Sequence, residues 1–347
     1  MDFRIRSFHL DELPELAELL NAVYRGSYEF VPFTGERLRS MVEERKLEVL
    51  VAEGGGVILG CVVYGKGPWG LEIRWLAVSE GEFQKTVENA LVEEVEKRAG
   101  GEVSAVVDAE SPMMGFWVSR GYRAEGGLYH MVARLEGVKP LPKVPNAAVI
   151  RSLRPEEEKQ LVETVNLAYG RERLKEGAIA RWKTQNPPFN EDWIHVAEMG
   201  GKIVSAVVSR PDTEYNEFFK ARRGYLGPAA TLPEFRGKNL ASALTCRAMN
   251  FLYEMGMDTV ALHTFEQNIP SLTLLKKLGF EIRHNQKFMR KKVYGRFSII
   301  FSASNSLTRV SMNSATFSWL YCLSSSCFLS CSLMVAKTLV TSKGFSM

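Results

Sequence analysis

The segment 239–255 carries apolar side chains at helical spacing. Those on its predicted buried face are Leu240, Leu244, Ala248, Phe251 and Met255. Gly256 ends this helix, and the apolar, β-branched run at 258–265 then predicts a strand. A second helix is expected to start near Asn268 and to stop at Leu278-Gly279-Phe280. This order of elements predicts an α/β domain.

The N-terminal half of the chain repeats the pattern of the C-terminal half. Residues 5–16 align with 150–161 without a gap, at an offset of 145 residues. The same offset relates 51–53 to 196–198, each of which is Val-Ala-Glu before a Gly-containing turn and an apolar strand. A repeat of this length predicts two copies of one domain.

The predicted boundaries place the N-terminal copy at 1–137, a stiff Pro-rich linker at 138–147 and the C-terminal copy at 148–293. We expect the two copies to pack as an intramolecular pseudo-dimer, because each can cover a sheet edge or face of the other and the linker is short. Whether the whole chain is a monomer stays open.

A strand predicted at 224–231 leads into a tight turn, Arg236–Asn239, just before the helix. Successive backbone N–H groups of such a turn point into one concavity, and the first turn of the helix adds unpaired donors and the positive end of its dipole. Gly237 has no Cβ to block a close oxyanion, and Arg236 and Lys238 can add positive charge. The turn therefore predicts a diphosphate-binding site.

The order strand, Arg-Gly turn, helix, strand, Asn-initiated helix and Leu-Gly-Phe resembles the GCN5-related N-acetyltransferase (GNAT) superfamily over about 223–293. The unequal halves resemble its tandem members, such as the mycothiol synthases. The resemblance implies that each copy is a mixed, mostly antiparallel sheet flanked by helices, and that acetyl-CoA is the cosubstrate. Two positions depart from the family pattern, since Glu234 stands where Arg or Gln is usual and Asn239 where a second Gly or Ala is usual.

The resemblance also implies which residues contact the cosubstrate. They are Leu232, Arg236, Gly237, Lys238, Asn239, Leu240, Ala241 and Asn268. In the family the pantetheine arm lies between two splayed parallel strands, and Asn268 matches an Asn that often touches it. Asn268 is also suited to cap the helix that follows, and the two roles are compatible. The Tyr that many members use as general acid would fall at Leu275, so that acid is missing.

Candidates for proton transfer lie on predicted strands or at their ends. Transfer of an acetyl group to a primary amine requires the site to take up the proton of the amine and then to protonate the thiolate. Glu266 is the first candidate base, with a loop or helix-start charge as its alternative. His263 is the second, although a single His on a strand is often a packing residue. Glu198 is a third, but its repetition as Glu53 favours a structural role, and Tyr225 is either the replacement acid or a core residue.

The first copy lacks the diphosphate turn. Its equivalent segment, 79–86, has Glu80 and Glu82 where the diphosphate would lie. Like charges repel there, so we expect a single CoA site, in the second copy. The resemblance also implies that N-terminal helices and loops, such as 24–33 and 169–193, build the acceptor pocket.

These features predict an N-acetyltransferase that transfers the acetyl group of acetyl-CoA to a small-molecule or peptide amine by direct attack. The protein would contribute chiefly by positioning the reactants and by polarising the thioester. The alternative is a non-catalytic acyl-CoA-binding sensor or interaction module. Leu275, Asn239 and Glu234 are the residues that favour it.

Charge and cysteine content narrow the partners. Residues 1–293 hold all 40 acidic residues and 40 of the 44 basic ones, so their formal charges cancel. No overall positive electrostatic field therefore favours binding to nucleic acid. Cys61 and Cys246 are expected to be buried and reduced, and neither has neighbours spaced for a disulfide, a nucleophile or a metal site. Charged residues begin at Asp2, a pattern that does not predict a signal peptide. We therefore expect a cytoplasmic protein.

The last 54 residues, 294–347, differ in composition from the rest. They have no acidic residue, are rich in Ser and hold three of the five cysteines. The predicted fold is complete at a closing strand, 288–293, so we expect the tail not to belong to it. Residues 315–336 are uncharged and long enough to span a bilayer, but their many Ser residues weaken the interpretation as a membrane anchor. A shifted or misassigned reading frame is the favoured interpretation of the tail.

Overall fold

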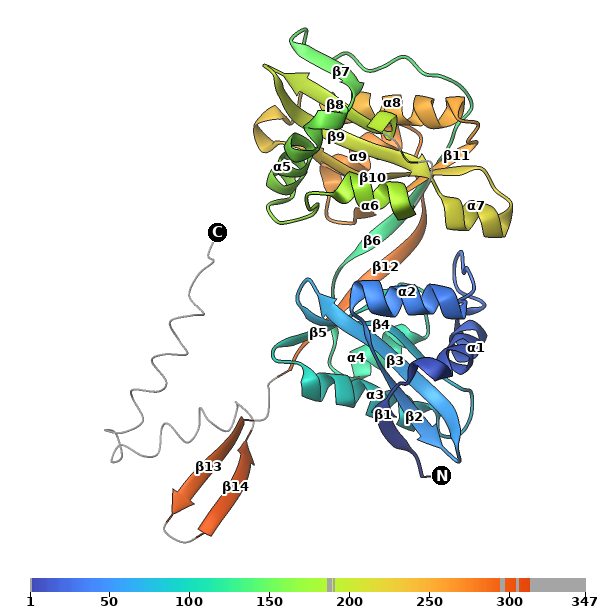
Figure 1. The fold of residues 1–347 in the computed structure, drawn as a ribbon, viewed down its shortest axis with the longest axis vertical. Coiled ribbons are helices and arrows are strands. Elements are labelled where there is room, and N and C mark those ends of the chain that lie inside the picture. Colours follow the sequence, from blue (N-terminus) through green and yellow to red (C-terminus); the bar gives the residue numbers. More distant parts are fainter. Residues whose placement is uncertain (1, 186–188, 190, 294–296, 304–305, 313–347) are drawn as a thin grey trace. The chain divides into compact units, whose positions relative to one another are not determined.

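The computed structural model describes residues 2–185, 189, 191–293, 297–303 and 306–312 of the 347-residue chain (Figure 1). The described residues fall into two compact units. Unit 1 lies within 1–8, 42–104 and 291–347, and unit 2 within 9–41 and 105–290. Each unit is described by itself below.

Unit 1 is built on an antiparallel sheet with one long helix against it. Its strands are β1 (Arg4–Ser7), β2 (Glu48–Gly54), β3 (Val57–Gly67) and β4 (Gly70–Val78), and each pairs with the next. Helix α3 (Gln84–Arg98) contacts β2, β3 and β4. Its buried apolar side chains are Val87, Leu91, Val92 and Val95. This spacing is that of one helix face, so burial of the face holds α3 on the sheet.

Further elements lie wholly or partly within the residue ranges of unit 1. Strands β13 (Phe297–Ala303) and β14 (Ser306–Met312) form an antiparallel hairpin. Helix α2 (Gly35–Arg45) and strand β5 (Glu102–Asp108) each cross a boundary between the residue ranges of the two units.

Unit 2 contains a mixed, mostly antiparallel sheet, in the strand order β12-β6-β11-β10-β9-β8-β7. In chain order the strands are β6 (Arg123–Arg134), β7 (Ala148–Ser152), β8 (Ile194–Met199), β9 (Lys202–Pro211), β10 (Arg223–Thr231), β11 (Thr259–Phe265) and β12 (Glu281–Lys292). Neighbours pair antiparallel except β10 and β11, which are parallel. The predicted sheet class is confirmed.

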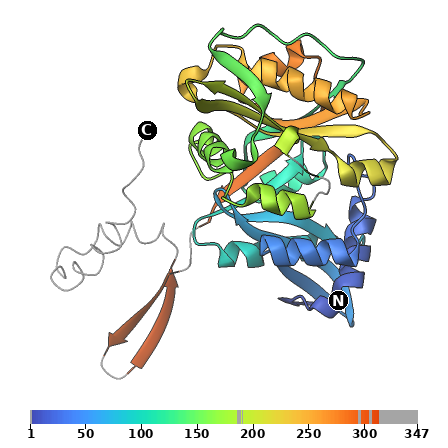
Figure 2. The same ribbon diagram turned by 45° about the horizontal axis from the view of Figure 1, so that its top comes forward.

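Apolar layers cover both faces of this sheet. Successive residues of a strand point to opposite faces, so Val196 belongs to one core cluster and Ala197 to the other. The Ala197 cluster includes side chains of α8 (Leu240–Glu254) and α9 (Ile269–Lys277). The Val196 cluster includes side chains of α5 (Glu158–Tyr169) and α6 (Ala178–Gln185). Figure 2 shows the helices on the two sides of the sheet.

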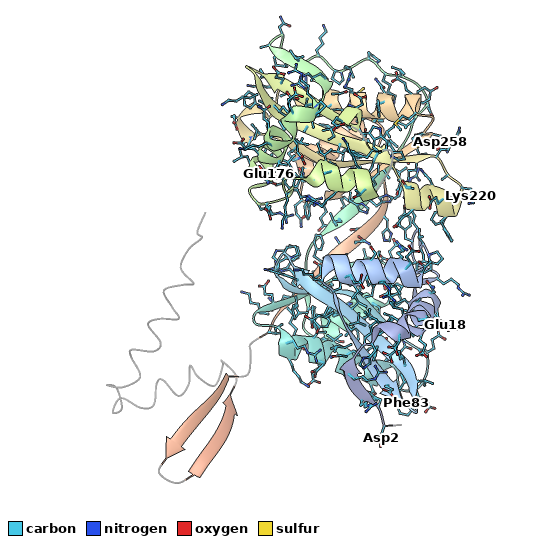
Figure 3. The ribbon with its side chains drawn as sticks, in the orientation of Figure 1. Asp2, Glu18, Phe83, Glu176, Lys220 and Asp258 are labelled. Carbon is cyan, nitrogen blue, oxygen red and sulfur yellow. The ribbon has the colours of Figure 1, made fainter. Side chains whose placement is uncertain are left out.

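The remaining helices of unit 2 are α1 (Leu13–Tyr24), α4 (Met113–Ser119) and α7 (Thr213–Phe219). Lys220, labelled in Figure 3, follows α7 in a left-handed conformation with φ 53°. Asp258, also labelled, pairs with Arg222 just before β11. Lys220 and Asp258 thus lie shortly before the first residues of β10 and β11, respectively.

A strand from the N-terminal half of the sequence completes the sheet of unit 2. Strand β6 lies between β11 and β12 and pairs antiparallel with both, as Figure 1 shows for β6 and β12. The sequence pattern did not predict this insertion. It brings the side chains of 123–134 next to the two C-terminal strands, where the site described below lies.

The 145-residue repeat is present in the structure. Helices α1 and α5 begin and end at residues related by this offset, as do the first residues of β3 and β9. An ion pair repeats too, because Arg6 bonds to Glu53 and Arg151 to Glu198. Glu198 is therefore committed to a structural contact, as its repetition suggested.

The predicted helix at 239–255 is α8, with two differences in its buried face. Phe251 is only partly buried and packs against the Val196 cluster. Met255 follows the helix and is 38% exposed, because the chain already turns away there. Leu240, Leu244 and Ala248 are buried as expected. Cys246 is also buried, and its thiol lies 3.7 Å from the carbonyl oxygen of Pro140, so the predicted linker lies against α8.

Membrane-spanning helices and metal sites can be assessed only in the described part of the chain. Among the described residues, no helix combines the length and the apolar character that a membrane span requires. In the same residues, no group of three or more His, Cys, Asp or Glu side chains is placed to hold a metal ion. The segment 315–336 lies outside the described residues.

Candidate functional site

Strands β10 and β11 pair over only part of their length. The parallel register ends at Tyr225 opposite Ala261, whereas β10 continues to Thr231 and β11 to Phe265. On its other side β10 shifts register against β9 between Leu226 and Ala229. A bulge of this kind turns a strand away from its neighbour. Among the described residues, β10 therefore has no strand partner on its β11 side beyond Tyr225.

The turn after β10 has the backbone conformation that an anion-binding turn needs. Gly237 has φ +76° and Asn239 φ +59°, both in the left-handed region. A Cβ placed on Gly237 would meet no atom within 4 Å, so the space beside its α-carbon is open. Helix α8 begins at the next residue, Leu240, and its first N–H groups have no acceptor within the helix.

The two cations of the turn differ in what they contact. The Arg236 guanidinium donates to the carbonyl oxygens of Thr231 and Ala168, both at 3.3 Å. The Lys238 ammonium lies 4.8 Å from the ring centroid of Phe235. Arg236 therefore ties the turn to the end of β10 and to α5, while Lys238 is exposed and stays close to the turn.

The other predicted cosubstrate residues lie around this turn or at the next helix. Leu240 is 1% exposed, so its side chain belongs to the core and only its backbone can face a ligand. Leu232 and Ala241 are partly buried. The Asn268 side chain accepts a hydrogen bond from the Ser271 N–H, which confirms its predicted role as a helix cap.

A second group of side chains lines a cavity of about 320 Å³ in unit 2. Its floor includes three histidines on adjacent strands, His263 on β11, His130 on β6 and His284 on β12. The strand register aligns His130 with both of the others. The ring centroids of His130 and His263 are 4.7 Å apart.

Two tyrosines extend this row of histidines. The Tyr225 hydroxyl lies 2.8 Å from His263 Nδ1, and the Tyr28 hydroxyl lies 3.1 Å from His130 Nδ1. The Tyr28 ring also stacks on His284, with centroids 4.3 Å apart. A polar row therefore runs across the strands and begins at Tyr225, the residue where β10 and β11 separate.

Another part of the lining is charged. Arg223 is 6% exposed; its Nη1 lies 2.7 and 2.8 Å from the two carboxylate oxygens of Glu29, and its Nη2 lies 2.8 Å from Asp212. Burial lowers the pKa of Arg223, but the two carboxylates more than offset this and raise it overall. Arg210 lies on β9, and its guanidinium carbon is 5.4 Å from the ring centroid of Tyr225.

Burial sets the protonation of the rings. It lowers the pKa of His130 to about 3, with a further effect of the neighbouring His263 and Arg223, and it also lowers the pKa of His263. Burial raises the pKa of both Tyr225 and Tyr28. Near neutral pH both imidazoles are therefore uncharged, and both phenols keep their protons.

The structure brings two of the three candidate catalytic residues together. His263 and Tyr225 share a hydrogen bond and line the cavity. Glu266 does not line it, because its carboxylate pairs with the Lys287 ammonium on β12. Leu275, at the position of the missing family tyrosine, is 4% exposed and belongs to the core.

Sequence reasoning missed most of the cavity lining. The missed residues are Tyr28, Glu29, His130, Arg210, Asp212, Arg223, His284 and Gln286. Tyr28 and Glu29 do fall within the 24–33 segment expected to build an acceptor pocket. The concentration of three of the five histidines of the chain in this cavity depends on strand register. No local sequence signal carries that register.

Comparison with known proteins points to the same fold. The sequence profile of the acetyltransferase (GNAT) family matches residues 157–280. An acetyltransferase of Photorhabdus laumondii is 30% identical over 114 residues, which are 33% of this chain and 71% of that protein. A mycothiol acetyltransferase of Pseudarthrobacter chlorophenolicus is 23% identical over 176 residues, which are 49% of this chain. The chain spans 50% of the length of that relative.

Solved structures with the same architecture include tandem proteins. A GCN5-related N-acetyltransferase from Sphaerobacter thermophilus superposes with a TM-score of 0.63 and 18% identity, and the match covers 84% of this chain and 96% of that one. A tandem GNAT protein from the clavulanic acid biosynthesis pathway gives a TM-score of 0.59 and 15% identity, over 84% and 99% of the two chains. At these identities the likeness shows a shared fold.

Proposed function

The chain belongs to the acetyltransferase (GNAT) family, and from this premise we propose that it transfers the acetyl group of acetyl-CoA to a primary amine at a site in unit 2. The observation that carries the proposal is the hydrogen-bonded pair of Tyr225 and His263 at the point where β10 and β11 separate. There, a binding turn for a diphosphate and a polar cavity for an acceptor are joined by one pair of strands.

The turn at Arg236–Asn239 is the proposed holder of the CoA diphosphate. The open space at Gly237, the left-handed backbone of Gly237 and Asn239 and the start of α8 fit an anion held by backbone N–H groups. The exposed Lys238 side chain can reorient toward the bound anion, and its ammonium would add positive charge there. Bound acetyl-CoA supplies the activated acyl group.

The separated part of β10 is the proposed track for the pantetheine arm. From Thr231 back to Leu226 the strand covers about 16 Å, at roughly 3.3 Å per residue. Backbone groups along it can hydrogen-bond to the amides of the arm. The reacting end would then lie next to Tyr225.

His263 is the proposed base and Tyr225 the proposed acid. The lowered pKa of His263 keeps the imidazole neutral near pH 7, so it can accept a proton from the acceptor ammonium directly or through water. The raised pKa of Tyr225 keeps its proton available for the departing thiolate. Glu266 is assigned a structural role because of its pairing with Lys287.

An assay of thiol release from acetyl-CoA, with a panel of polyamines, amino acids and N-terminal peptides as acceptors, tests the proposal. We expect turnover with at least one acceptor class and a loss of turnover in His263→Asn, with CoA affinity unchanged. Tight CoA binding without thiol release for any acceptor would favour a non-catalytic acyl-CoA-binding module instead. Neither binding nor release would overturn both functions.

A further inference from the structure

We propose that the acceptor is an amine that also carries a carboxylate, and that Arg210 binds this carboxylate. The inference rests on the proposed function, because it names the acceptor of the same cavity. It would make amino acids, or peptides that present a nearby carboxylate, the substrate class.

Arg210 lies on the same face of the sheet as the proposed base and acid. It is the cross-strand partner of Tyr225 in the pairing of β9 and β10. His263 follows the partner of Tyr225 on β11 by two residues, so its side chain points to the same face. Strands β9 and β11 are two strand spacings apart, about 10 Å. A small molecule can therefore place its amine at His263 and its carboxylate at the long side chain of Arg210.

Arg210 is the lining cation that is free for a ligand. Among the described residues, no carboxylate lies within ion-pairing distance of it, and its guanidinium packs against the ring of Tyr225. The other lining arginine, Arg223, is fully engaged by Glu29 and Asp212. Arginine binds carboxylates with two parallel hydrogen bonds, so the free guanidinium favours this group in a ligand.

The charge balance of the lining argues against a polyamine acceptor. Both lining carboxylates, Glu29 and Asp212, are paired with Arg223, and the nearby Asp108 is hydrogen-bonded to His284. A second ammonium group would find no uncommitted carboxylate in the described lining. A zwitterionic acceptor adds no net charge and places its carboxylate opposite Arg210.

The exposed Arg173 is a second positive charge close to Tyr225. Both Arg210 and Arg173 lower the pKa of this phenol, although burial raises it overall. Arg173 lies outside the residues that line the cavity, with its guanidinium carbon 5.9 Å from the ring of Tyr169. It therefore strengthens the local preference for an anion without replacing Arg210 as the binding group.

The test compares amino acids, each offered as the free acid, as its carboxamide and as the amine that lacks the carboxyl group. The variants are Arg210→Gln and, as a control with the same change of charge, Arg222→Gln, which lies on the surface in an ion pair with Asp258. We expect kcat/KM for the free acid to exceed that for its carboxamide by about tenfold or more in the native protein. Arg210→Gln should remove this preference through KM, and Arg222→Gln should keep it.

Several outcomes would overturn the inference. They are equal turnover of acid and carboxamide, a preference for polyamines, and an acid preference that survives in Arg210→Gln. If no amine is turned over, calorimetric titration with the same free acids decides: binding that Arg210→Gln removes supports the carboxylate site while it counts against acetyl transfer. No binding of any free acid would overturn the carboxylate site itself.

Discussion

The helix-start turns of the two copies differ in charge and in backbone conformation. In the first copy the connection from β4 to α3 carries exposed Glu80 and Glu82, and α3 is preceded by Phe83 in a right-handed conformation. In the second copy the connection from β10 to α8 carries Arg236 and Lys238, and α8 is preceded by left-handed Asn239.

The same difference extends to the strands beside these turns. Strand β10 carries Tyr225 and β11 carries His263, whereas β4 has no tyrosine and β5 no histidine. All five histidines of the chain lie in the residue ranges of unit 2. A repeated fold thus keeps its packing in both copies, while the groups able to bind an anion and move a proton are concentrated in one.

The largest expected effect concerns the turn of the second copy. Gly237→Glu should abolish CoA binding and turnover, because it puts a side chain and a negative charge where backbone N–H groups must meet the diphosphate. Loss of two charge-assisted hydrogen bonds costs on the order of 3 kcal/mol, about a hundredfold in affinity. Calorimetric titration of CoA measures the effect.

The matched change in the first copy is Glu82→Gln, which should leave affinity unaltered. An unchanged melting profile must accompany the loss in Gly237→Glu, since an unfolded variant would lose binding as well. Two CoA sites per chain, or full affinity in the folded Gly237→Glu protein, would remove the distinction between the two turns.

The second prediction concerns the base. His263→Asn should lower kcat about a hundredfold, the size of a typical general-base contribution, without changing CoA affinity. Because burial lowers the pKa of His263, the native kcat/KM should stay level as pH falls through 6.5 and should decline only at lower pH. Tyr225→Phe should lower kcat by a smaller factor. Retention of the acidic decline in His263→Asn would show that another group is the base.

The sequence predicts the local elements of the second copy well. Helix α9, at Ile269–Lys277, begins next to the predicted Asn268 cap, and β11, at Thr259–Phe265, begins one residue after the predicted start. These elements depend on short-range patterns of apolar residues and on caps. The repeat was equally visible, because an offset of 145 residues relates whole elements of the two halves.

The cavity depends on long-range pairing and was not predictable in the same way. His130 reaches His263 and His284 only because β6 inserts between β11 and β12. Glu266 looked like a base because the sequence did not reveal that β12 places Lys287 beside it. His263 and Tyr225 were identified, but their hydrogen bond follows from the register of β10 and β11.

The third prediction uses the uneven distribution of histidines. Buried His130 and His195 each have a pKa lowered to about 3, mainly by burial. Such a group is neutral when folded, so the unfolded chain binds more protons below pH 6.5, and stability falls as pH drops from 6.5 toward 3. At pH 5 each histidine should cost about 2 kcal/mol relative to pH 7.

Hydrogen exchange at pH 7 and pH 5, corrected for intrinsic rates, measures this effect. Amides of β6, β8 and β11 should lose protection at pH 5, while those of β2 and β3 in unit 1 should keep it. Equal loss in both units would mean that the acid sensitivity comes from carboxylates common to both copies. In His130→Asn the loss of protection in β6 should be smaller than in the native protein.

The smallest expected effect concerns the ion pair that both copies share. Glu198 bonds to Arg151 at 2.6 Å, and Arg151 also bonds to Glu157 at 2.7 Å. Glu198→Gln should therefore lower the melting temperature only slightly, since Arg151 keeps one carboxylate. Glu53→Gln removes the equivalent partner of Arg6 in unit 1 and should act in the same direction. Neither change should alter thiol release, because the pair stabilises the fold in each copy.

A different result would change the role of Glu198. If Glu198→Gln stops turnover in a folded protein that still binds CoA, Glu198 acts in proton transfer. In that case an ion pair that is structural in the first copy would also take part in catalysis in the second copy.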